Sequence, residues 1–312
     1  MGERHANHPF VSRHLPIIFM AAMFEKTVKQ PSESGLRLPA APGSIQRGST
    51  LKDLLDREAI DCLAHNVARV YPAFNGTSFQ RSAHDSLEPL EILQRGHHLA
   101  RVLREHLPRR YRDAVEILLL SLTPPLSETT ELGLGGFFYL PHVFFVADYG
   151  LDANGNDGED PFEASMRAQY EITRRFSAEF SMRPFLIDRP ARTLERLQTW
   201  THDPDPHVRR LCSEGARPRL PWAVRIPTFI KDPTPVLPIL EALKDDPDLY
   251  VRRSVANHVG DIAKDHLELA LALCTRWLSG ASAGRKWVIR HALRHPAKKG
   301  IPAAMQLRQQ AK

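Results

Sequence analysis

The sequence predicts an all-α protein, built as a HEAT-like helical-repeat solenoid with a concave basic face. Residues 203–214 begin with a proline-containing acidic turn that leads into a Val-Arg-Arg helix start, and residues 245–257 repeat this order 43 residues later. A weaker third copy occupies residues 288–294. Periods of about 40 residues with such a turn before a helix are typical of HEAT-like repeats. Each helix pair buries its apolar face against its neighbours, so the units stack.

Positive charge is concentrated in this repeat region. The net charge is +6, and residues 200–312 carry 19 Lys and Arg against 11 Asp and Glu, whereas the remainder carries 23 against 25. Paired arginines recur at equivalent positions, so stacking would align them on one concave face. The distribution favours a polyanionic partner such as nucleic acid, with a merely solvated basic surface as the alternative.

The chain divides into three parts by composition. Residues 1–48 mix His, Pro, Ser and Gly without periodicity and predict a disordered N-terminal extension. Residues 49–300 are the expected repeat domain, and residues 301–312 are expected to be a C-terminal tail. Residues 15–24 are apolar but lack a clear small-residue cleavage site, so a dispensable extension is expected and an exported protein is the alternative.

Cysteine usage and hydropathy point to the cytoplasm. Cys62, Cys212 and Cys274 are scattered without a CxxC pair, which predicts neither a disulfide framework nor a zinc site and fits a reducing compartment. No apolar run approaches the roughly 20 residues that span a bilayer. We therefore expect a cytoplasmic monomer with no membrane segment, metal or other cofactor.

Helical spacing begins at residue 51. Three apolar stripes, each ended by a proline, predict helices at residues 63–70, 92–103 and 111–122. Residues 137–147 are apolar on nearly every side. We predict a buried helix there, because Pro141 disfavours a central strand.

Residues 152–163 resemble the beginning of a calcium-binding loop. Asp152, Asn154 and Asn156 fit ligand positions 1, 3 and 5, and Glu163 falls at position 12. Asp157, however, stands where the sharp turn of such a loop needs glycine. An ordinary polar loop is therefore expected, with calcium binding as the alternative.

Residues 162–185 are the next predicted helical region, and they contain an unusual acid. Glu179 lies among the aromatic residues Phe176 and Phe180. A carboxylate in apolar surroundings is costly to bury unless it is paired, and its pKa shifts. The structural interpretation is an ion pair with Arg183, one helix turn later.

Four blocks of the sequence resemble the bacterial AlkC-type DNA alkylation repair proteins. They comprise residues 176–186, 209–223, 250–266 and 287–294. The second block contains a long and idiosyncratic Ser-Glu-Gly-x-Arg-Pro-Arg-Leu-Pro-Trp run, and the likeness extends over about residues 51–300. The resemblance implies a HEAT-like DNA glycosylase of base excision repair that needs no metal. Its implied substrates are cationic bases such as 3-methyladenine and 3-methylcytosine in double-stranded DNA, removed without drawing the base into a pocket.

One departure from this family concerns the grip on DNA. Many members carry an immunoglobulin-like domain after the repeats, whereas this sequence ends at Lys312. We therefore expect the shorter form of the family, with DNA held by the repeats alone. The weak third repeat also leaves the last helices less defined.

The resemblance assigns the chemistry to four residues: Glu179, Glu214, Asp261 and Trp222. A cationic N-alkylated base is already a good leaving group, so the enzyme needs carboxylates near C1′ to stabilise oxocarbenium character and orient water. The indole of Trp222 would stack on the deoxyribose or the base, with packing in the core as its alternative. For Glu214 and Asp261 the alternative is simple neutralisation of Arg210 and Arg253.

Seven arginines are candidates for phosphate contact, because guanidinium groups match phosphate with two donors. They are Arg209, Arg210, Arg217, Arg219, Arg252, Arg253 and Arg290. Some are expected to brace the turn aspartates between repeats instead, leaving about half to touch DNA. The rival interpretation of the whole chain is a non-catalytic HEAT scaffold that binds DNA or a protein partner.

Overall fold

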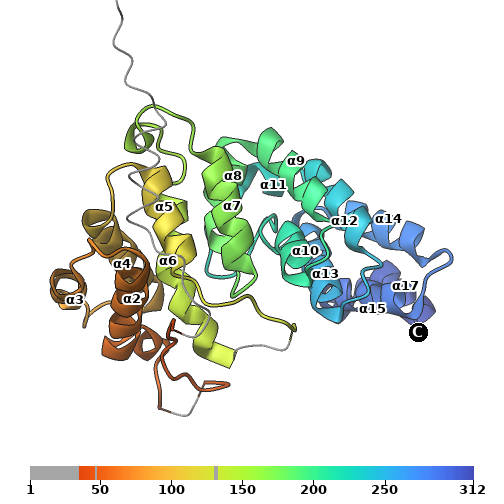
Figure 1. Ribbon diagram of the computed structural model, residues 1–312. Helices are drawn as coiled ribbons and strands as arrows, with labels where there is room; N and C mark the ends of the chain where they lie inside the picture. The colour runs from red at the N-terminus through yellow and green to blue at the C-terminus, as the bar shows by residue number, and fades with distance from the viewer. Residues whose placement is uncertain (1–34, 46–47, 130–132) are drawn as a thin grey trace, which may run out of the picture.

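The computed structural model describes residues 35–45, 48–129 and 133–312, and within them the chain is helical without a strand (Figure 1). The first part contains η1 (Leu51–Leu55), α2 (Arg57–Val70), α3 (Gly76–His84), α4 (Ile92–His106), α5 (Tyr111–Leu120), η2 (Gly133–Tyr139), α6 (Leu140–Tyr149), η3 (Asn154–Asn156) and α7 (Phe162–Thr173). The remainder of the chain, from residue 179 onward, contains α8 (Glu179–Asp188), α9 (Pro190–Trp200), α10 (Pro206–Glu214), α11 (Pro227–Lys231), η4 (Thr234–Val236), α12 (Leu237–Leu243), α13 (Leu249–Asp265), α14 (Leu267–Leu278), α15 (Ala283–Ala292), α16 (Arg294–Lys298) and α17 (Pro302–Gln310). The all-α prediction is confirmed.

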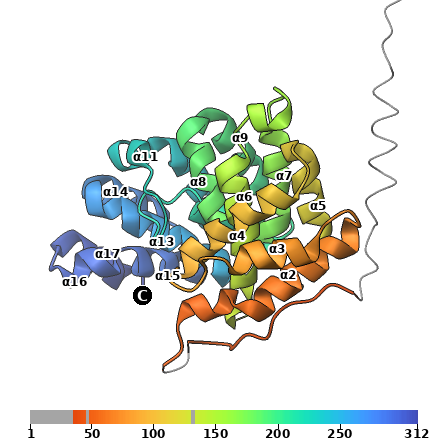
Figure 2. The ribbon, with the colours of Figure 1, turned by 90° about the vertical axis from the view of Figure 1, so that its left-hand side faces the viewer.

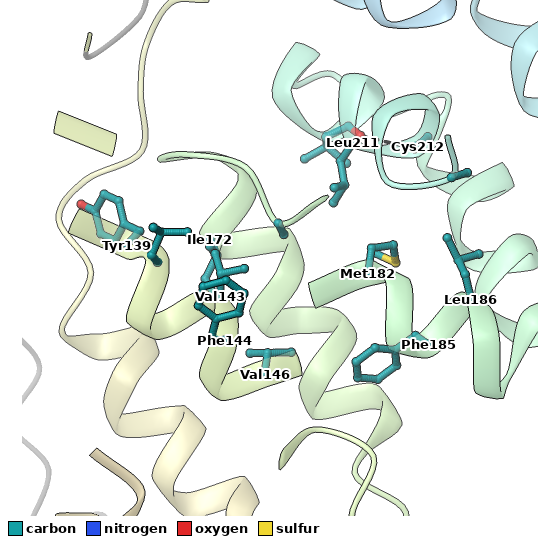
Figure 3. Packing of buried hydrophobic residues seen from close by; sticks show 14 of the residues in the cluster. Tyr139, Val143, Phe144, Val146, Ile172, Met182, Phe185, Leu186, Leu211 and Cys212 are labelled. Carbon is teal, nitrogen blue, oxygen red and sulfur yellow. Dashed lines mark hydrogen bonds between the residues drawn. The ribbon is translucent and has the colours of Figure 1, made fainter. Parts of the chain in front are cut away.

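The helices stack in chain order from α2 at one end to α17 at the other (Figure 1). Helix α4 packs on α6 and α6 on α8, and α10 packs on α13, which in turn packs on α15. Figure 3 shows Val143 of α6, Ile172 of α7 and Met182 of α8 in one continuous apolar layer, with Leu211 of α10 beyond them. Each helix therefore buries its apolar stripe against its neighbours, as a helical-repeat fold requires.

The repeated acidic turns open helices as predicted. Asp205 caps α10, and its carboxylate accepts a hydrogen bond of 2.9 Å from the main-chain N–H of His207. Asp248 takes the equivalent N-cap position of α13, but its side chain makes no capping hydrogen bond, unlike that of Asp205. A side-chain oxygen at the N-cap satisfies a helix N–H that has no partner within the helix. The two copies of the motif thus become neighbouring, contacting helices.

Two elements differ from the expectations, and a third agrees with them. The helical region predicted at residues 162–185 is broken into α7 and α8 at residues 174–178. The chain is held open there because the main-chain O of Arg174 accepts from Leu126 N at 2.9 Å, and the Arg175 side chain donates to Thr123 O. Residues 301–312 are not a loose tail: α17 buries Ala304 and Leu307. Residues 137–147 are helical, in η2 and α6, as expected.

The described part of the expected extension runs beside α2 (Figure 2). The main-chain N–H of Arg37 donates to Asn66 Oδ1 at 2.8 Å, and Asn66 Nδ2 donates back to Arg37 O at 2.8 Å. Ala40 N donates to Glu58 Oε1 at 3.2 Å. These bonds attach residues 35–45 to the repeat body. Residues 1–34, including the apolar run at 15–24, lie outside the described residues.

In the loop that resembles a calcium site, Asn156 and Glu163 bind other groups of the protein. Asn156 accepts from Arg112 N at 3.0 Å and donates to Glu159 O at 3.0 Å. Glu163 pairs with Arg192 at 2.9 Å and Arg196 at 2.7 Å. Where the structure places the chain, no group of three or more His, Cys, Asp or Glu side chains could hold a metal ion. Nor is any helix in the same residues long and apolar enough to cross a bilayer.

Candidate active site

A pocket of about 360 Å³ opens between α8, α10 and the beginning of α13. Its polar wall is formed by Ser177, Glu179, Arg210, Glu214 and Arg217. Aromatic side chains also line the pocket, namely Phe137, Phe176, Phe180, Trp222 and Tyr250. Three of the four residues predicted to carry the chemistry thus line one cavity, namely Glu179, Glu214 and Trp222, although Glu179 comes from a segment 35 residues before Glu214. A pocket with convergent charged groups in an aromatic wall is the usual form of a binding site.

Acids and bases alternate along one wall of this pocket. Glu179 pairs with Arg210 at 2.7 Å, Arg210 with Glu214 at 3.4 Å, and Glu214 with Arg217 at 2.6 Å. Arg217 continues to Asp261 at 2.8 Å, and Asp261 to Lys264 at 2.8 Å. We refer to these six residues as the charge ladder. Its members come from α8, α10, the following loop and α13, so the ladder joins successive layers of the stack.

Glu179 is the first residue of α8 and lies at the pocket end of the ladder. Its Oε2 accepts hydrogen bonds from Ser177 Oγ at 2.6 Å and from Arg210 Nη1 at 2.7 Å. The N-terminus of a helix also favours a negative charge. The ion pair expected between Glu179 and Arg183 is wrong, because the carboxylate turns to Arg210 on the next layer and Arg183 turns the other way.

Glu214 is the most enclosed carboxylate of the pocket wall. Its two oxygens accept from Arg217 Nη1 at 2.6 Å and from Ser254 Oγ at 2.6 Å. Burial alone would raise the pKa of Glu214, but the charges of Arg210 and Arg217 lower it below its usual value. Burial would likewise lower the pKa of Arg210, and the charges of Glu179 and Glu214 raise it instead. Glu214 and Arg210 are therefore both ionised at neutral pH.

Asp261 lies behind the pocket wall. Its side chain is 3% exposed and is held by Arg217 Nε and Lys264 Nζ, each at 2.8 Å. It is not among the residues that line the pocket. The alternative for this residue, neutralisation of Arg253, is wrong, because Arg253 is exposed and the partners of Asp261 are Arg217 and Lys264.

Trp222 stands at the pocket mouth with its indole exposed. Its exposed fraction is 62%, so packing in the core, the alternative for this residue, is wrong. Its backbone lies in the left-handed region, with φ of 65°. A bulky residue there is strained, and such strain persists only where the surroundings impose it. The loop of residues 215–226 thus presents an aromatic face to whatever enters the pocket.

The predicted phosphate-binding arginines fall into different environments. Arg209 binds Asp246 at 2.6 Å and the main-chain oxygens of the preceding turn, and Arg252 binds the carbonyls of Asp246 and Pro247. Arg209 is therefore an inter-repeat brace of the kind expected of some arginines, whereas Arg252 binds the turn that opens its own helix, α13. Arg219 pairs with Asp265 at 2.6 Å.

The remaining four candidates also differ in their surroundings. Arg290 donates to the carbonyl of Ala311, and Arg253 is exposed on α13. Arg210 and Arg217 belong to the charge ladder. Of the seven arginines, Arg253 is therefore the one most open to a phosphate.

Several site residues were not predicted from the sequence. Tyr250 lies with its ring centroid 5.3 Å from the guanidinium carbon of Arg210, and its ring meets His207 edge-on. Ser177 binds both Glu179 and Arg210. The available signal was position, because Ser177 precedes the acid by two residues and Tyr250 directly precedes the second Val-Arg-Arg segment. A serine or a tyrosine at these positions cannot be recognised as a site residue until the fold shows its neighbours.

Comparisons with known proteins agree with this geometry, although no family model matches the chain. The uncharacterized protein YhaZ of Bacillus subtilis (strain 168) is 37% identical over 258 residues, which cover 82% of this chain and 67% of the relative. Among solved structures, the alkylpurine DNA glycosylase AlkC of Pseudomonas fluorescens, bound to DNA containing an abasic site analog, matches with a TM-score of 0.73. Its sequence identity is 38%, over 83% of this chain and 67% of that chain.

Proposed function

Because this chain belongs to the AlkC family, we propose that it is a DNA glycosylase that excises cationic alkylated bases from double-stranded DNA in base excision repair. The proposed substrates are 3-methyladenine and 3-methylcytosine. The observation that carries the proposal is the exposed Trp222 facing a pocket whose polar wall begins with Glu179. Monomeric action in the cytoplasm, without a cofactor, stays a prediction.

The charge on the lesion determines what the site must supply. In the proposed reaction the C1′–N bond breaks, its electron pair neutralises the departing base, and the deoxyribose gains oxocarbenium character. Water then attacks C1′ and loses a proton. An anionic group close to C1′ stabilises the developing charge and orients that water. An aromatic face adds attraction for a cation, which suits the indole of Trp222.

The ladder divides this work between its acids. Glu179 retains a side chain that is 16% exposed at the pocket, so we assign it the contact with the sugar and the water. Glu214 is held by Arg217 and Ser254, and Asp261 by Arg217 and Lys264. We therefore assign these two acids to hold Arg210 and Arg217 in place. This arrangement leaves Glu179 as the catalytic carboxylate of the proposed site.

A second group of cations supports binding to the DNA backbone. Arg253, Arg294 and Arg308 have no carboxylate within 4.0 Å among the residues that the structure describes. Burial and the repulsion of Arg217 and Arg308 lower the pKa of Arg294. Burial, with repulsion from all three of these arginines, lowers the pKa of His291 to about 4. A phosphate would relieve that repulsion, so we assign the three arginines to the DNA backbone.

The alternative is a scaffold that binds DNA without cleaving a bond. Methylated duplex DNA incubated with excess protein separates the two functions, if the released bases are identified and timed in a single turnover. The proposed glycosylase releases 3-methyladenine faster than spontaneous loss, and Glu179→Gln slows that release. Binding without any release by the wild-type protein would establish the scaffold instead.

A further inference from the structure

Arg183 is a buried guanidinium without an acidic partner in the described part of the chain. It lies in the middle of α8, one turn after Glu179, and is 1% exposed. Burial and the charge of Arg217 lower its pKa to about 10, so it remains charged at neutral pH. A buried charge is costly unless other groups satisfy it. The groups that satisfy this one are all main-chain carbonyls.

These carbonyls belong to the loop that carries Trp222. Nη1 of Arg183 donates to Arg217 O at 2.9 Å and to Gly215 O at 3.3 Å, and Nη2 donates to Pro218 O at 3.4 Å. Nε donates to Val224 O on the other side of the tryptophan. The guanidinium therefore binds the loop on both sides of Trp222, at residues 215–218 and at residue 224. The exposed Trp222 lies between these two attachment points.

The close approach of the loop to α8 depends on a glycine. A Cβ on Gly215 would lie 3.0 Å from Cγ of Met182, the residue before Arg183, and 3.0 Å from Leu211 O. Because Gly215 has no side chain, the beginning of the loop packs directly against α8. The same helix thus bears Glu179 at its N-terminus and the clamp one turn later, which sets the spacing between the carboxylate and the indole.

We propose that Arg183 is a positioning residue that holds Trp222 in its strained conformation at the pocket mouth, so that the indole and Glu179 act on the same nucleotide. This inference rests on the proposed function. Arg183 does not line the pocket and touches no reacting group. It acts through four carbonyls, and the left-handed backbone of Trp222 is the strain that they stabilise.

The chain offers a matched control. Arg95 on α4 is 3% exposed and also donates to main-chain carbonyls, at 3.0 Å to Leu90 O, 3.0 Å to Lys52 O and 3.2 Å to Leu55 O. Neither these carbonyls nor the exposed Glu88, whose carboxylate lies 3.7 Å from Arg95, belongs to the pocket loop. Arg95→Lys therefore measures how much stability is lost when a buried arginine can no longer bind several carbonyls. Arg183→Lys causes the same kind of loss and, in addition, any change in the position of Trp222.

The first measurement is single-turnover release of 3-methyladenine. A displacement of about 1 Å at a reacting centre can lower a rate about 100-fold, and we expect a loss of that order for Arg183→Lys. Arg95→Lys should remain within about twofold of wild type. The double variant Arg183→Lys/Trp222→Ala should be no slower than Trp222→Ala, because both changes remove one function. Additive losses, or equal losses in the two lysine variants, would overturn the proposal.

The second measurement does not depend on activity. Amide hydrogen exchange in residues 215–226 should accelerate in Arg183→Lys and stay at the wild-type rate in Arg95→Lys. Unchanged exchange in both variants would refute the clamp, whether or not the protein releases bases. If exchange accelerates in Arg183→Lys but the wild-type protein releases no base, the clamp is supported and the glycosylase is refuted.

Discussion

Oε2 of Glu179 lies 2.7 Å from Nη1 of Arg210, across the boundary between α8 and α10. Both side chains are largely enclosed, at 16% and 17% exposed, and both line the pocket. The pair fixes the position of the carboxylate in the pocket. The opposing guanidinium limits how far Glu179 can move toward the substrate, so its position is set before DNA arrives.

Replacement of Glu179 by Gln should slow base release about 100-fold, the usual order for the loss of one group that stabilises a transition-state charge. The affinity for undamaged duplex should be equal to that of the wild type or slightly higher, because the substitution removes a negative charge from a basic surface. Glu163→Gln, which removes an acid paired with Arg192 and Arg196 away from the pocket, is the control. A rate for Glu179→Gln within threefold of the control would exclude a catalytic role.

Buried histidines make stability depend on pH. His258 is fully buried behind Glu214, its Nδ1 lies 3.0 Å from Ser213 O, and burial lowers its pKa to about 4. The unfolded chain takes up a proton near pH 6.5 whereas the folded one does not, so stability falls as the pH falls from 6.5 to about 4. We expect this residue to remove about 2 kcal/mol between pH 7 and pH 5.

Urea unfolding at pH 7 and pH 5 measures that change. His258→Gln removes the titrating group and should reduce the difference between the two pH values, even if the variant is less stable at both. The exposed His295 supplies the control, since His295→Gln should leave the difference unaltered. An undiminished pH difference in His258→Gln would contradict the assignment.

Sequence periodicity located α2, α4 and α5 because each one buries a regular stripe, and the acidic turn before Val208 and Val251 marked where α10 and α13 begin. The break before Glu179 had no such signal. Residues 174–178 contain neither proline nor glycine, and the helix ends there because distant groups, Thr123 O and Leu126 N, bind the chain. Long-range hydrogen bonds of this kind leave no local pattern.

The same limit applies to the site. Sequence spacing suggested Arg183 as the partner of Glu179, whereas the true partner, Arg210, lies 31 residues further along the chain. The four candidate residues themselves came from a family resemblance rather than from spacing. The fold adds what the resemblance could not supply, namely that Asp261 lies behind the wall and that Tyr250 lies in it.

The backbone of Trp222 allows a test of stored strain. Its φ of 65° is ordinary for glycine and unfavourable for any residue with a Cβ. Trp222→Gly should therefore be more stable than Trp222→Ala by about 1 kcal/mol, although both lose the indole. Chemical unfolding of the two variants measures the difference. Equal stabilities would show that the loop relaxes once the indole is removed, and base release should be slow in both variants.

The arginines of the repeats should separate into those that bind phosphate and those that hold the fold. Arg253 is exposed, whereas Arg209 is 12% exposed in its side chain and pairs with Asp246. Removing one phosphate contact lowers the slope of log K against log salt by about 0.9. Arg253→Ala should show that loss with little change in stability. Arg209→Ala should keep the wild-type slope and lose about 3 kcal/mol of stability or more, because it leaves a buried carboxylate unpaired.

Duplex titrations between 50 and 200 mM salt, together with urea unfolding, give both quantities for each variant. The comparison holds residue type constant and varies only the environment of the guanidinium. A reduced slope for Arg209→Ala would mean that the ion pair with Asp246 opens when DNA binds. If both Arg253→Ala and Arg294→Ala leave the slope unchanged, the DNA backbone binds elsewhere on the protein. Unlike Arg209, neither arginine has to break an ion pair in the described residues before it can bind a phosphate.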